Sequence, residues 1–139
     1  MTNITANTNT IPATSNRADA LEAWLPLVGR VLIAAIFILS GLSKIADPAG
    51  SMAYIASVGL PLPAVALAGA IVVEVVGGAL LISGYKVRAV ATVIALFSLA
   101  TAVFFHNDLA DQNQFIHFFK NIAIAGGLLQ IVVFGKARG

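Results

Sequence analysis

Two ionisable side chains lie inside segments that are otherwise apolar enough to cross a bilayer. Arg30 falls near the start of the first such segment and Glu74 near the middle of the second. An ionisable group at that depth is costly unless it is paired, so it marks a functional site by default. If the two segments are antiparallel, the depths of the two residues differ by roughly 6 Å at about 1.5 Å per residue. We therefore predict an Arg30–Glu74 ion pair or polar site; alternatively, Arg30 extends to the interface and Glu74 is protonated.

A second group of polar residues falls at the opposite end of the apolar segments from Arg30. Lys44 closes the first segment, and His106 follows the third. Lys120 and Asn121 open the fourth. The three potential cations at one depth suit an anionic lipid headgroup, a carboxylate or a quinone carbonyl. The alternative is that these lysines only extend to the headgroup region.

Other chemistry finds little support in the sequence. The histidines are His106 and His117, and we interpret them as interfacial polar residues, because bis-histidine haem ligation needs two opposed rings. The absence of cysteine removes thiolate nucleophiles, iron–sulfur clusters and cysteine zinc sites. No glycine-rich phosphate loop, Ser-His-Asp arrangement or metal-spaced carboxylate cluster is evident. We therefore expect no metal, no intrinsic cofactor and no stand-alone enzyme.

The composition indicates that these residues are carried by a lipid-embedded chain. Hydrophobic residues make up 59% and charged residues 10% of the 139 residues. Soluble domains carry about 25% charged residues, so this chain has too much apolar surface to bury in one core. The net charge of +2 comes without a basic run, and we expect no nucleic-acid partner.

The apolar pattern predicts an all-α fold: a membrane-embedded antiparallel four-helix bundle. Each predicted span approaches the ~20 residues that cross a bilayer. A short interfacial helix is expected between spans one and two, where residues 49–60 are too few to cross. Residues 1–23 are expected to form a disordered cytoplasmic tail, and residues 24–139 the membrane domain. The predicted spans cover residues 25–43, 64–83, 87–105 and 118–134.

Four spans place both termini on one side of the membrane. The basic residues are concentrated on that side, and Lys44 and Lys120 fall on the other. The positive-inside rule therefore predicts cytoplasmic termini. The basic residues on the side of the termini are Arg17, Arg30, Lys86, Arg88, Lys136 and Arg138.

Glycines are placed where neighbouring helices would approach closely. Gly77 and Gly78 follow Glu74 by three and four residues, which puts them near its face of the helix. Gly41 shares a face of the first span with Lys44, and Gly126 and Gly127 lie within the fourth. We predict that these glycines serve helix packing.

Several short motifs in order resemble a known family. They are Gly29-Arg30, Ser40-Gly41-Leu42-Ser43-Lys44, Glu74-Val75-Val76-Gly77-Gly78, Phe105-His106 and Phe119-Lys120-Asn121. Over about residues 27–135 the chain resembles the DoxX family of small four-helix membrane proteins, especially bacterial inner-membrane members of the YphA type. The resemblance implies the four-helix count and a location in the bacterial inner membrane.

The same resemblance implies a role next to redox enzymes. The family is named after a subunit of a quinone-linked oxidase system, so we expect a non-enzymatic accessory subunit that contacts quinone and membrane oxidoreductase subunits. A small-solute or proton-coupled transporter, which would need a homo-oligomer, remains an alternative. A scaffold or assembly factor is the third.

Overall fold

The computed structural model describes residues 13–136, and every regular element in that range is helical. α1 spans Ala13–Ala46 and α2 spans Pro48–Ser57. α3 (Pro63–Ile71), a π-helical turn η1 (Val72–Val76) and α4 (Gly77–Ser83) follow one another without a break. α5 (Val87–Phe105) and α6 (Gln112–Phe134) complete the chain. Four of the described helical stretches are long and apolar enough to cross a membrane, which confirms the predicted all-α membrane bundle.

Side-chain caps explain where the shorter helices begin. The Asp47 carboxylate accepts a hydrogen bond from Gly50 N at 3.0 Å, and Pro48 takes the first helical position of α2. Asp111 caps α6 in the same way, accepting from Gln114 N at 3.0 Å. This cap starts α6 at Gln112, six residues before the predicted start of the fourth span. The sequence analysis assigned the polar residues just after Asp111 to a loop, and the structure places residues 112–117 in the helix instead.

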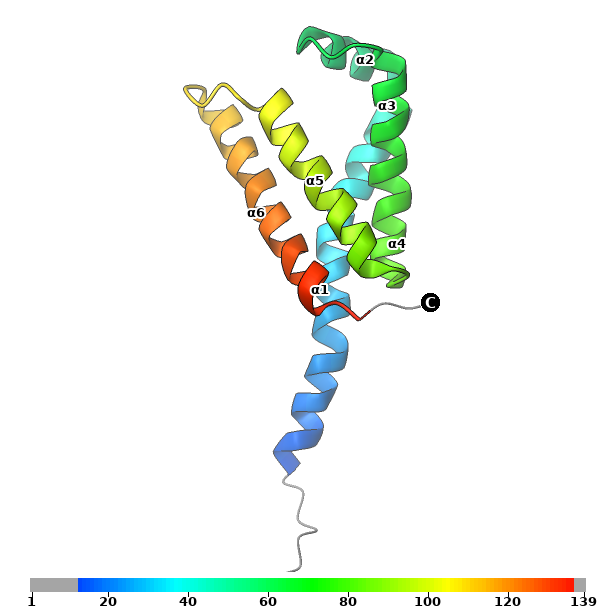
Figure 1. The fold of residues 1–139 in the computed structure, drawn as a ribbon, viewed down its shortest axis with the longest axis vertical. Helices are drawn as coiled ribbons and strands as arrows, with labels where there is room; N and C mark the ends of the chain where they lie inside the picture. The colour runs from blue at the N-terminus through cyan, green and yellow to red at the C-terminus, as the bar shows by residue number, and fades with distance from the viewer. Residues whose placement is uncertain (1–12, 137–139) are drawn as a thin grey trace, which may run out of the picture.

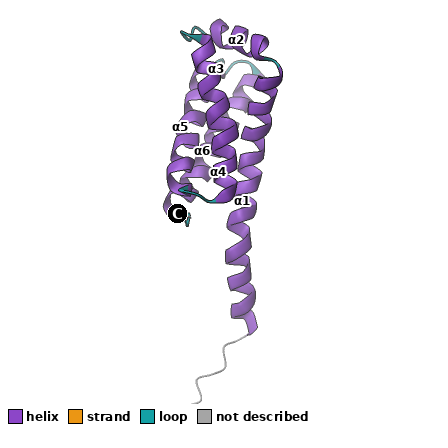
Figure 2. Ribbon diagram, turned by 90° about the vertical axis from the view of Figure 1, so that its right-hand side faces the viewer, coloured by secondary structure: helices purple, strands orange, loops and turns teal. Residues whose placement is uncertain are grey.

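The first helix is also longer than predicted. α1 begins at Ala13, so residues 13–23, which the sequence assigned to a disordered tail, are helical; residues 1–12 lie outside the described range. Its 34 residues span about 51 Å, well beyond the ~30 Å of a hydrocarbon core. The amino-terminal part of α1 accordingly extends past the bundle in Figures 1 and 2.

The helices form two units that open toward the end carrying α2. α5 packs along α6, and α1 packs along the continuous rod of α3, η1 and α4. Figure 1 shows the two units converging near the start of α5 and spreading apart toward α2. α1 enters the bundle and α6 leaves it at the converging end. The described chain therefore starts and ends on the same side of the bundle.

The core where the units converge is built from aliphatic side chains and alanines. Leu81, Ile94 and Leu128 are fully buried. Ala34 and Ala91 fill positions where a larger side chain would separate the helices. Many apolar side chains on the outside are exposed, as a lipid-facing surface requires.

Candidate functional site

Glu74 lies in the π-helical turn η1 in the middle of the second membrane-crossing rod. Its side chain is buried, with 4% of its surface exposed. A π-turn inserts one residue into a helix and re-aims the side chains around it, and such turns are frequent at functional sites. Four valines surround Glu74 in η1, and nothing in that pattern signals a π-turn. The sequence identified the residue but not the distortion that carries it.

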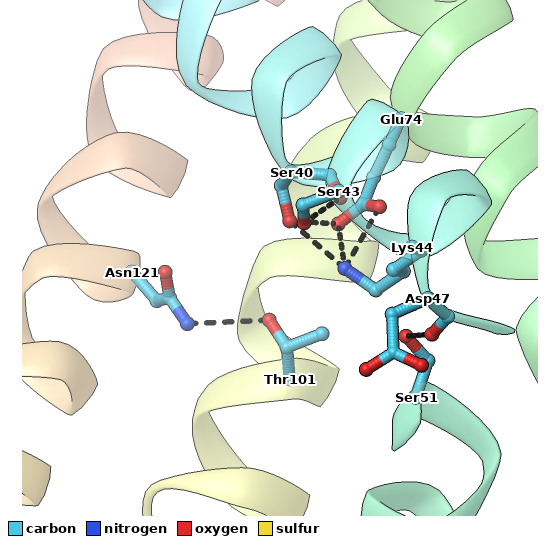
Figure 3. Close-up of polar contacts among 8 residues, drawn as sticks. All are labelled: Ser40, Ser43, Lys44, Asp47, Ser51, Glu74, Thr101 and Asn121. Atoms are coloured by element: carbon cyan, nitrogen blue, oxygen red, sulfur yellow. Dashed lines mark hydrogen bonds and ion pairs between the residues drawn. The ribbon is translucent and has the colours of Figure 1, made fainter. Parts of the chain in front are cut away.

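The buried carboxylate of Glu74 pairs with Lys44. Lys44 Nζ lies 3.0 Å from Oε2 and donates a hydrogen bond to Oε1 at 3.0 Å. Ser40, one turn before Lys44 on α1, donates from Oγ to the same Oε1 at 3.0 Å and accepts from Lys44 Nζ at 2.8 Å. Figure 3 shows these three side chains converging between α1 and η1. The result is a charge-balanced network between α1 and η1, in which Oε2 of Glu74 pairs with Lys44 but accepts no hydrogen bond from the described residues.

The predicted Arg30–Glu74 pair was wrong. Two contacts define how α1 packs against the rod of α3, η1 and α4. Gly41 lies beside Glu74, and Arg30 lies beside Gly84. Arg30 and Gly41 are 11 residues apart on one helix, which corresponds to roughly 16 Å rather than 6 Å. Helical side chains also lean toward the helix amino terminus, so Lys44 leans toward Glu74 and Arg30 away from it.

Arg30 packs instead against the turn that ends α4. Its guanidinium lies beside Gly84, with Nη1 2.9 Å from the position that a β-carbon on Gly84 would take. Gly84 has φ 78° and terminates α4, so the cation lies at the negative end of that helix dipole. Arg30 Nε is buried without a hydrogen-bond partner among the described residues. Arg30 is therefore a neighbour of the terminal-side turn and takes no part in the Glu74 network.

A cavity of about 580 Å³ lies between the two helical units, next to the Lys44–Glu74 pair. Its wall is mostly apolar and includes the aromatic side chains of Phe37, Phe97 and Phe104. The four residues predicted as an outer-rim group all line this cavity, so the structure brings them together: Lys44, His106, Lys120 and Asn121. Glu74 lines it too. Glu74 and the four predicted rim residues thus line one cavity, whereas Arg30 does not.

The two histidines face each other at the wide end of the cavity. The rings of His106 and His117 are stacked with centroids 5.0 Å apart and planes 27° apart. Lys120 Nζ lies 2.9 Å from His117 Nδ1, and an ammonium group only donates hydrogen bonds. Burial, and then the charges of His117 and Lys120, lower the pKa of His106 below 6.5. Lys120 therefore brings its ammonium group to the stacked histidines at this end.

Further polar side chains that were not predicted border the cavity, among them Thr101, Tyr54 and Ser40. Asn121 Nδ2 donates to Thr101 Oγ1 at 3.2 Å, linking α6 to α5 (Figure 3). Tyr54 reaches from α2, with its ring 5.3 Å from that of Phe105. Ser40 completes the Glu74 network. Only Ser40 carried a sequence signal, because its spacing of four residues places it on the face of Lys44.

The glycines divide into close contacts and open positions. A β-carbon on Gly41 would lie 2.5 Å from Val75 Cγ2, and one on Gly78 would lie 2.6 Å from Ile38 Cγ1. A β-carbon on Gly77 would lie 3.3 Å from Ile94 Cδ1, and one on Gly127 would lie 3.6 Å from Ile33 Cδ1. Gly126 has no atom within 4 Å of that position, so its predicted packing role was wrong. The fourth helix presents Gly126 away from its neighbours.

Comparison with known proteins places this fold and site in context. A family model described as DoxX matches residues 25–107. The chain is 34% identical over 122 residues to inner membrane protein YphA of Escherichia coli (strain K12), covering 84% of this chain and 86% of the relative. It is 36% identical over 112 residues to inner membrane protein YqjF of the same organism, covering 78% and 82%. No solved structure matches.

Proposed function

The chain belongs to the DoxX family, and from this premise we propose that it is a multi-pass inner-membrane protein that binds a quinone-class ligand. It would serve a membrane oxidoreductase as a non-catalytic subunit. The observation that carries the proposal is the cavity between the two helical units, whose wall is largely apolar and whose polar groups include the ammonium donors of Lys44 and Lys120. Its volume of about 580 Å³ falls within the range of small-molecule sites.

The arrangement of donors suits two carbonyl oxygens on opposite sides of a ring. Lys44 faces the cavity from α1, and Lys120 and Asn121 face it from α6. A quinone carbonyl only accepts hydrogen bonds, and ammonium and amide groups supply them. The aromatic and aliphatic wall suits a flat, lipid-soluble ring. We expect no redox cofactor in this chain itself, so a partner would carry the electrons.

Direct binding tests the ligand class. The full chain in lipid nanodiscs would be titrated with a short-chain ubiquinone and with a menaquinone analogue. Replacing Lys120 by Met removes one donor, and we expect binding about tenfold weaker from the loss of one charge-assisted hydrogen bond. Lys136→Met is the matched control, since Lys136 lies past the end of α6 on the terminal side. Absence of quinone binding by the wild-type chain contradicts the proposal.

The redox role is tested separately. Affinity purification from native membranes in mild detergent should recover an oxidoreductase subunit in stoichiometric amount. The cavity variant Lys120→Met should still recover it, because the cavity lies inside the bundle and the partner binds its outside. Recovery of no oxidoreductase by either chain limits the function to ligand binding alone.

A second candidate function, transport, is favoured by Glu74. A buried carboxylate in a π-turn on a cavity wall is an arrangement suited to binding a proton or cationic solute. Solute flux into liposomes would then change on Glu74→Gln; unchanged flux argues against it. If Glu74 only holds a scaffold together, Glu74→Ala lowers abundance and any activity follows abundance.

We also infer that the termini lie in the cytoplasm. Basic residues of the described chain gather where α1 and α6 meet the terminal side, and Lys44 and Lys120 lie at the other end. Arg138, which the sequence counted on the terminal side, lies outside the described residues. A reporter that functions only in the cytoplasm should be active when it is fused to the carboxyl terminus. Activity of a periplasm-specific reporter at the same position would show that the orientation is reversed.

A further inference from the structure

A second concavity lies on the lipid-facing side, away from the cavity described above. It is a groove of about 310 Å³ between the rod of α3, η1 and α4 and the first half of α5. Val72 and Val76 of η1 line one side of the groove, and Val93 of α5 lines the other. Each of these side chains is about half exposed. Gly77 lies along the groove, where a β-carbon would approach Ile94 Cδ1 to 3.3 Å. The groove is therefore apolar along its length and open to the membrane.

The length of the groove matches one leaflet of the bilayer. It extends from Val72, close to the level of Glu74, to Tyr85 and Lys86 beyond the end of α4. Val72 and Ser83 are 11 residues apart, which corresponds to roughly 16 Å along a helix. Half of a ~30 Å hydrocarbon core is about the same length. An acyl chain from the leaflet on the side of the termini would run from the interface to the bilayer centre within it.

The interfacial end of the groove is positively charged. Lys86 lines the groove, and its Nζ lies 5.6 Å from the centre of the Tyr85 ring. Arg88, two residues on, is held at the same end because its Nε donates to the Gly135 carbonyl at 2.8 Å. α5 begins immediately after Lys86, so the positive end of its dipole lies there too. No carboxylate lines the groove among the described residues.

We propose that this groove binds one anionic phospholipid from the leaflet on the side of the termini. The acyl chain lies along the valines and Gly77, and the phosphate contacts Lys86. Tyr85 occupies the headgroup level, where amphipathic aromatic rings are enriched. This site is separate from the quinone cavity and stands whether or not a quinone binds there.

Native mass spectrometry of the full chain tests the proposal. The protein would be equilibrated in nanodiscs of equal phosphatidylglycerol and phosphatidylcholine with identical acyl chains. We expect one phosphatidylglycerol per chain to be retained preferentially. Lys86→Gln should lower that preference about fivefold, the ratio that corresponds to about 1 kcal/mol per basic residue at a membrane surface. Val76→Phe, which fills the groove, should lower retention of both lipids.

The controls separate a groove site from ordinary lipid contact. Val65→Phe enlarges an exposed valine of α3 outside the groove and should leave retention unchanged. Inorganic phosphate at millimolar concentration should not displace the lipid, because the acyl chain holds it. Equal retention of the two lipids, displacement by phosphate alone, or a dimer that excludes lipid from the groove would each overturn the proposal. Thermal unfolding of each variant checks that it is folded.

Discussion

Lys44 on α1 and Glu74 on η1 form an ion pair with Nζ and Oε2 3.0 Å apart, although 30 residues separate them in sequence. The side chain of Glu74 is 5% exposed and that of Lys44 is 25% exposed. Both side chains line the cavity. The pair therefore joins the first two membrane-crossing helices and borders the candidate ligand site. The pair is thus placed to stabilise the bundle and to contact the proposed ligand.

The ion pair predicts strong energetic coupling between its members. Lys44→Met or Glu74→Met alone leaves one uncompensated charge in the membrane and should lower the free energy of unfolding by about 1–3 kcal/mol. The double variant Lys44→Met with Glu74→Met should be more stable than the sum of the single effects implies. Unfolding in detergent, followed by circular dichroism, measures all four proteins.

Arg30 supplies the control for that cycle. The cycle of Arg30→Met with Glu74→Met should show additive effects, because the guanidinium lies at Gly84 and not at the carboxylate. Coupling of Arg30 to Glu74 that equals the coupling of Lys44 would contradict the observed pairing.

The helix interface predicts different outcomes for two glycines. Gly78→Ala places a methyl group against Ile38 and should destabilise the protein by about 1–3 kcal/mol. Gly126→Ala meets no neighbouring atom and should be neutral or stabilising by up to about 1 kcal/mol, as expected in a helix. Thermal unfolding in detergent compares them, and equal losses of stability would contradict the close approach of α1 and α4.

The turn after α4 requires glycine for two reasons. Gly84 has φ 78°, which costs an alanine about 1–2 kcal/mol, and the new methyl group would press on the Arg30 guanidinium. We therefore expect Gly84→Ala to lower the unfolding temperature clearly. Gly29→Ala, in an open position on α1, is the matched control and should not. Restoration of Gly84→Ala by Arg30→Ala would identify the steric part of the loss.

The stacked histidines predict a pH dependence of stability. The pKa of His106 is lowered from 6.5 in the folded protein, so between the two values the unfolded chain binds more protons. Stability from this residue is complete above pH 6.5 and is lost as the pH falls toward the folded value. His106→Gln should reduce the slope of unfolding temperature against pH in that window. His117 and Lys120 face the same ring, and an unchanged slope in the His106→Gln variant would contradict the assignment to His106.

The sequence predicted the membrane fold because hydropathy is a local property. The third span, residues 87–105, coincides with α5, and a short helix was expected between the first two spans. The start of α6 was missed because a single capping carboxylate, Asp111, extends a helix into polar residues. The beginning of α1 was missed because a helix can continue past the membrane without an apolar pattern.

The sequence by itself determined which residues are candidates for a polar site. Glu74, Lys44, His106, Lys120 and Asn121 stood out because polar groups in an apolar chain are costly. Only the tertiary structure decided how they combine, since the partner of Glu74 depends on helix register and on the direction of side chains along α1. Register is set by Gly41 and Gly78, which let two backbones approach, and a π-turn then aims the carboxylate at Lys44. Such packing depends on contacts between segments that are far apart in the sequence, so no local sequence pattern can predict it.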